Sequence, residues 1–128
     1  MSEFGYLSVR AFASSAQLPI EGAAIVVTQP SENGARLLAS RLTDRNGKIT
    51  PISIKAPDRS ESQQAGGDIP YTSVDITADH PDYERILVEN VQIFSGVLSR
   101  QNLEMIPLDS RPETFNMTEI FRISGQNL

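Results

Sequence analysis

The stretch TDRNGK, residues 43–48, brings together the residue types of a calcium loop, a phosphate loop and a tight turn. An EF-type calcium loop needs further acids at regular steps and a closing Glu, but isoleucines and a proline follow instead. A phosphate loop needs more glycines and a Lys-Ser or Lys-Thr pair that opens a helix. Asp44 suits the start of a type I turn, and Asn46 or Gly47 tolerates its left-handed exit. The stretch therefore predicts a structural turn between two strands.

His80 is the single histidine, and the chain has no cysteine. Thiolate sites and multi-histidine zinc sites are therefore excluded. A lone histidine lacks the partners that would set its tautomer and pKa for base catalysis. Because Pro81 follows it, His80 is predicted to be a solvent-facing turn residue.

The carboxylates do not form a pattern that is typical of a catalytic site. Asp79, Asp82 and Glu84 could share a calcium ion, but a polar loop is the favoured interpretation. Asp75 alternates with apolar neighbours and is expected to face solvent. No Gly-x-Ser-x-Gly motif is present, and no two acids are placed as a glycosidase requires. We predict a protein that is not an enzyme, with no catalytic residue, no metal and no cofactor.

Two tyrosines are the candidate binding residues. The polar stretch 58–69 is the longest without periodicity, and long loops on rigid sandwiches commonly carry binding sites. Tyr71 at its exit and Tyr83 in the next loop, with the adjacent Asp82, could form a platform for a sugar or peptide. The alternative is that both tyrosines only hold loops through their hydroxyl groups.

The elements that must position these residues are strands, because apolar residues recur with a period of two between clusters of Gly, Pro, Asn, Asp and Ser. The strand candidates are 5–13, 22–29, 35–43, 48–57, 70–78, 84–94 and 99–108. About seven short strands in such a length is typical of a sandwich. The chain is predicted to be an all-β antiparallel sandwich of about seven strands.

Three irregularities in the alternation carry further information. The pattern over 35–43 is undecided between its two faces, as in an edge strand. Pro51 removes a ladder donor, so a bulge or an edge position is expected there. The apolar phase also shifts by one residue near Glu89 and Asn90.

Three segments are predicted: a leader at 1–4, the sandwich at 5–108 and an extension at 109–128. The extension favours a strand, with a capping box at Ser110 and Glu113 offering a helix as the alternative. Such a strand would be the eighth of the sandwich or would add to the sheet edge of a neighbouring subunit. Its apolar face, the predicted assembly strand, consists of Phe115, Met117, Phe121 and Ile123.

Charge and hydropathy exclude several partners. The chain of 128 residues has a formal net charge of −5, and its eleven Lys and Arg residues are scattered singly. Nucleic acid is therefore not expected as a partner. No stretch approaches the ~20 apolar residues of a membrane span, and no signal peptide is visible. We expect cytoplasmic synthesis and no membrane insertion.

An ordered set of motifs resembles the prealbumin-like, or transthyretin-like, sandwich of the carboxypeptidase regulatory-like domains. These motifs are a Pro-Ile-xx-Ala entry at 19–23, the Thr-Asp-xx-Gly turn at 43–47 and the pair Asp82 and Tyr83. The likeness covers about residues 5–108 and is greatest to versions in spore-forming bacteria, some joined to peptidoglycan-binding or spore-cortex-lytic modules. It implies a prealbumin-like fold.

The resemblance also bears on function. Related pilin domains carry an isopeptide bond from a first-strand lysine, but Arg10 stands on that strand here, and a guanidinium is a poor nucleophile. Related hydrolases use several histidines and a Tyr-Arg-Gly-Ser ending, which this chain lacks. What remains is a non-catalytic accessory module of a bacterial spore or cell envelope that recognises peptidoglycan or a protein partner. The alternative is a structural subunit that forms homo-oligomers by strand addition through its termini.

Overall fold

The computed structural model describes residues 2–14, 16–58 and 70–108, which form eight β-strands and no α-helix. The strands are β1 (Ser2–Ala13), β2 (Leu18–Pro19), β3 (Ala24–Ser31), β4 (Gly34–Leu42), β5 (Ile52–Pro57), β6 (Thr72–His80), β7 (Tyr83–Ile93) and β8 (Leu98–Met105). The predicted assembly strand and most of the long polar loop lie outside the described residues. The predicted all-β sandwich is confirmed, with one short strand more than expected.

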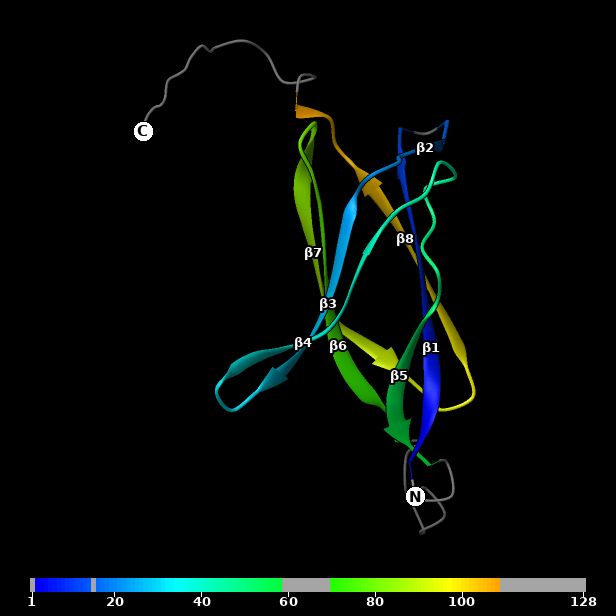
Figure 1. Ribbon diagram of the computed structural model, residues 1–128, viewed down its shortest axis with the longest axis vertical. Coiled ribbons are helices and arrows are strands. Elements are labelled where there is room, and N and C mark those ends of the chain that lie inside the picture. The colour runs from blue at the N-terminus through cyan, green and yellow to red at the C-terminus, as the bar shows by residue number, and fades with distance from the viewer. Residues whose placement is uncertain (1, 15, 59–69, 109–128) are drawn as a thin grey trace.

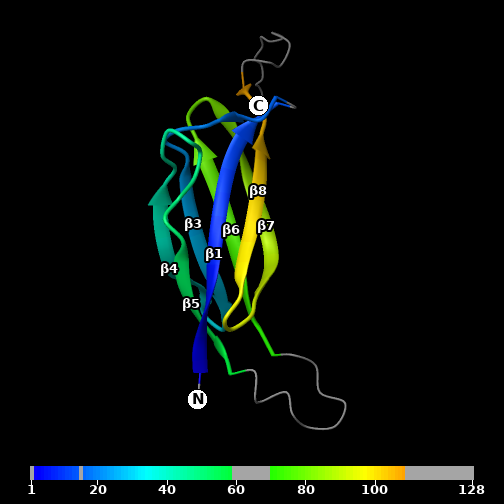
Figure 2. The ribbon, with the colours of Figure 1, turned by 90° about the vertical axis from the view of Figure 1, so that its right-hand side faces the viewer.

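The strands form two layers, which Figures 1 and 2 show from two sides. In the first layer, the β1 sheet, β1 pairs with β2, β5 and β8. In the second layer, the β3 sheet, the order is β4-β3-β6-β7. The tip of the β3–β4 hairpin extends away from the two layers (Figure 1).

One strand pair departs from the antiparallel arrangement predicted for the sandwich. β1 and β8 run parallel, from Tyr6 opposite Leu98 to Ala13 opposite Met105. The other strand pairs are antiparallel. Hydrophobic alternation cannot reveal strand direction, because residues of one face recur every second position in either direction.

The core lies between the layers and follows the predicted alternation. Leu7, Val9 and Ala11 of β1 are fully buried, as are Val74 and Ile76 of β6. The even-numbered residues of β1 consequently point to the outer face of its sheet. This parity decides which side chains are available on the surface of the β1 sheet.

The predicted irregularities also appear. Within residues 2–14, 16–58 and 70–108, β4 pairs with β3 alone and β5 pairs with β1 alone, so both lie at the edge of a sheet. The phase change in β7 is a bulge, where the register against β6 shifts between Val74 and Ile76 and Asn90 adopts a positive φ of 62°. The leader expected at 1–4 is not separate, because β1 begins at Ser2 and pairs with the end of β5.

Candidate functional site

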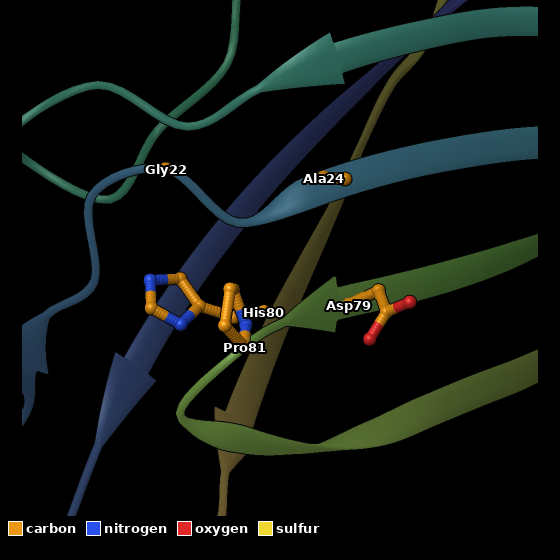
Figure 3. A pocket seen from close by; sticks show the side chains of 5 residues that line it. All are labelled: Gly22, Ala24, Asp79, His80 and Pro81. Atoms are coloured by element: carbon orange, nitrogen blue, oxygen red, sulfur yellow. The ribbon is translucent and has the colours of Figure 1, made fainter.

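Two hollows flank the β6–β7 turn at one end of the sandwich. The first, of 310 Å³, is lined by Gly22, Ala24, Asp79, His80 and Pro81 (Figure 3). The second, of 470 Å³, is lined by Pro81, Asp82, Tyr83, Pro107 and Leu108. Three residues singled out from the sequence, His80, Asp82 and Tyr83, therefore meet at this end.

His80 is the last residue of β6 and is half-buried, not the freely exposed turn residue that was expected. Its Nδ1 accepts a hydrogen bond from the backbone N–H of Asp82 at 3.1 Å. Its Nε2 lies 3.2 Å from the carbonyl oxygen of Glu21, which can only accept. The geometry fits the neutral tautomer with the proton on Nε2. In Figure 3 the ring projects from β6 toward the segment that carries Gly22.

The acids near this ring do not form a metal site. Asp79 makes an ion pair with Arg85, with Oδ2 and NH2 3.0 Å apart. Among the described residues, no three His, Asp or Glu side chains gather in a way that could hold a metal ion. The proposed calcium trio of Asp79, Asp82 and Glu84 is therefore not assembled. The hollows offer a surface for contact.

The structure does not bring the two candidate tyrosines together. Tyr71 precedes β6 and Tyr83 follows it, so nine residues of strand, about 30 Å, separate them. Tyr71 is 46% exposed and lies beside Phe94, with ring centroids 5.6 Å apart. Tyr83 is half-buried and faces the ring of His80. A shared aromatic platform is excluded by the length of β6.

The 43–48 stretch is the structural turn that the sequence predicts. Oδ1 of Asp44 accepts the backbone N–H groups of Asn46 at 2.8 Å and Lys48 at 3.0 Å. Gly47 supplies the left-handed position, with φ at +75°. The N–H of Lys48, then that of Asn46 and the charge of Lys48, hold the pKa of Asp44 below its usual value, against partial desolvation.

Thr43 anchors this turn to the core in a role that sequence reasoning did not assign. It is buried, with 3% of its surface exposed. Its hydroxyl donates to the carbonyl oxygen of Ile20 at 2.7 Å and accepts the N–H of Ala23 at 2.9 Å. The Thr-Asp-xx-Gly motif thus joins the entry of β3 to the turn after β4.

The outer face of the β1 sheet carries a second candidate surface, which the sequence analysis also missed. Phe4, Tyr6 and Leu98 are 48%, 41% and 40% exposed, and we call them the apolar patch. Next to it, a hollow of 210 Å³ is lined partly by Arg10, Lys48 and Arg100, and we call it the cationic hollow. The alternation of β1 indicates that its even-numbered residues point outward. The sequence does not indicate that β8 lies beside β1 as a parallel strand.

Comparisons with known proteins support the fold. No protein-family model and no curated protein matches the chain. Among solved structures, the TIE protein of Bacillus anthracis is similar, with 13% identity and a TM-score of 0.53 over 82% of this chain and 17% of that one. An (S)-allantoin synthase gives 14% identity and a TM-score of 0.53 over 80% and 41%.

A shaft pilin from Lactobacillus rhamnosus GG aligns less well, with 12% identity and a TM-score of 0.49 over 85% of this chain and 48% of the pilin. The chain spans less than half of each of these three structures. At such identities, the two better alignments show a common β-sandwich fold and carry no residue roles.

Proposed function

We propose that this chain is a non-catalytic binding module, and that its ligand is a partner protein of a bacterial spore or cell envelope. The envelope setting rests on the resemblance to carboxypeptidase regulatory-like domains; peptidoglycan is the competing ligand. One observation carries the proposal. The side chains of Thr43, Asp44 and His80, which could take part in chemistry, instead form hydrogen bonds that hold the fold together. The apolar patch and the cationic hollow, by contrast, lie on the outer face of a sheet.

The side chains best suited to catalysis already have hydrogen-bond partners in the backbone. A general base needs a free ring nitrogen, but both nitrogens of His80 have backbone partners. The Asp44 carboxylate is occupied by two backbone N–H groups of its own turn. By contrast, the exposed aromatic side chains Phe4 and Tyr6, next to arginines, are the residue types enriched in protein interfaces.

Retention experiments test the proposal. The immobilised chain should retain envelope proteins, and the double variant Tyr6→Ser, Leu98→Ser should lose them. The matched control is Leu87→Ser on the opposite sheet, a side chain that is 57% exposed. Co-sedimentation with purified peptidoglycan distinguishes the competing ligand. No retention on either material would contradict a binding function, as would a measured turnover that His80→Ala abolishes.

Assembly by strand addition is the second candidate, and β4 gives it specific support. Among the strands that the structure describes, Gly34–Leu42 pairs with β3 alone, so its other edge is open to a strand of a second chain. Leu37 and Leu42 on this strand are 63% and 68% exposed. Light scattering over a range of concentrations should then show an oligomer that Leu37→Lys, Leu42→Lys disperses. Deletion of 110–128 tests whether the termini are used instead.

A further inference from the structure

The cationic hollow concentrates positive charge in an acidic chain. Arg10 lies opposite Lys48 in an isolated antiparallel bridge and opposite Asn102 of β8 on its other side. Ser8, the next outward residue of β1, lies opposite Arg100. Two strands, β1 and β8, and the segment before β5 therefore present three cations, an amide and a hydroxyl on one face, although the whole chain has a net charge of −5.

The lining of the hollow itself contains no acid, although the carboxylate of Asp44 is close enough for its charge to interact with that of Lys48. It consists of Ser8, Arg10, Lys48, Arg100, Gln101 and Asn102. Within the described ranges, the ion pair closer than 4 Å is that of Arg85 with Asp79, on the other sheet. Like charges held together raise the free energy of the site unless an anion binds between them. The grouping therefore favours an anionic ligand.

Arg10 is held in position before any ligand arrives. Its guanidinium carbon lies 4.9 Å from the centroid of the Phe12 ring, in a cation-π contact. One of its terminal nitrogens also donates to the carbonyl oxygen of Gln17 at 3.5 Å. A guanidinium fixed in this way loses less side-chain entropy when it binds a carboxylate with two parallel hydrogen bonds.

The apolar patch continues the same rows of side chains. Tyr6 lies opposite Leu98, one row before Ser8 and Arg100, and two rows before Arg10. Successive rows are two residues apart, which is about 6.7 Å along a strand. Every second side chain of an extended peptide has the same spacing. A simple phosphate would use the cations and leave the apolar row without a partner.

We infer that the outer face of the β1 sheet binds an extended acidic segment of a partner protein. An apolar side chain of that segment lies on Tyr6 and Leu98, and carboxylates two and four residues away meet Arg100, Arg10 and Lys48. The inference rests on the proposed function, since it names the chemistry of the partner for that module. No covalent step is involved.

The test uses the full chain and a blocked nine-residue peptide in which one leucine is followed, at every second position, by glutamates with serines between them. Titration followed by amide NMR shifts should give saturable binding, with the shifts concentrated on Ser8, Arg10, Arg100 and Asn102. Affinity should fall as salt is added. Arg100→Gln should weaken it about tenfold, while Arg41→Gln on the other sheet should leave it unchanged.

Two comparison ligands sharpen the result. The same peptide with glutamines in place of glutamates should not bind, and leucine changed to serine should weaken binding several-fold. Absence of binding, shifts elsewhere, or equal shifts from inorganic phosphate alone would overturn the inference. If the peptide does not bind but envelope proteins are still retained, only the peptide site is contradicted. If envelope proteins are not retained either, the proposed function is contradicted as well.

Discussion

The ring of His80 stands edge-on to the ring of Tyr83, with centroids 5.1 Å apart and planes at 81°. The contact joins the last residue of β6 to the first residue of β7. The same imidazole accepts the N–H of Asp82, in the turn between these strands, and its Nε2 pairs with the carbonyl oxygen of Glu21, in the segment before β3. His80 therefore braces this end of the sandwich through one ring contact and two hydrogen bonds to the backbone.

Replacing His80 by alanine should destabilise the chain by about 1–2 kcal/mol, because it removes the ring contact and two hydrogen bonds of a half-buried side chain. Urea unfolding measures this change. Glu21→Ala is the matched control, since Glu21 contributes only its backbone oxygen. Proton–nitrogen correlation spectra should also place the imidazole proton on Nε2, and a proton on Nδ1 would contradict the brace.

Thr43→Val should cost at least about 2 kcal/mol, because a buried carbonyl of Ile20 and a buried N–H of Ala23 both lose their partner. Thr43→Ser keeps the hydroxyl and should cost clearly less. The difference between the two variants in chemical denaturation isolates the hydrogen bonds from the methyl group. Equal losses would show that the hydroxyl is not the anchor of the turn.

The turn carboxylate should make stability depend on pH in the acid range. Because the pKa of Asp44 is lower in the folded chain, the carboxylate stabilises the fold above its unfolded pKa, and this contribution is lost as pH falls through the folded pKa. Asp44→Asn should lower the melting temperature near neutral pH, and the gap to the parent should narrow on acidification. A gap that stays constant down to low pH would refute this linkage.

Two substitutions at Asn90, in the bulge of β7, should differ in their effect on stability. Both Asn90→Gly and Asn90→Val remove the side-chain acceptor of the Ser73 hydroxyl, but only valine resists the positive φ of 62°. The Asn90→Val variant should therefore be about 1–2 kcal/mol less stable than the Asn90→Gly variant, as measured by thermal unfolding. Similar melting temperatures would mean that the backbone can relax out of the bulge.

Much of the fold could be predicted from the sequence because burial in a sandwich follows a period of two. Leu7, Val9, Val74 and Ile76 lie in the core as expected, and the phase shift at Asn90 is the bulge. The turn at Asp44 could be predicted because its hydrogen bonds are local. In each case the information lies within a few residues.

The candidate site could not be predicted in the same way, because its contacts are distant in sequence. Arg10, Lys48 and Arg100 become neighbours only when β1 pairs with β8 and with the segment before β5. The same limitation explains the separation of Tyr71 and Tyr83, which were expected in adjacent loops but lie beyond opposite ends of β6. Loop adjacency along a chain says little about proximity in a sandwich.

The parallel pairing of β1 with β8 sets how the sandwich should respond to tension. A pull on the start of β1 and on the end of β8, in opposite directions, runs along both strands. It would load the eight registered pairs from Tyr6–Leu98 to Ala13–Met105 together in shear. Antiparallel strands pulled from adjacent ends would instead open one pair at a time. The first and last strands that the structure describes are therefore joined in a geometry in which their hydrogen bonds would resist tension together.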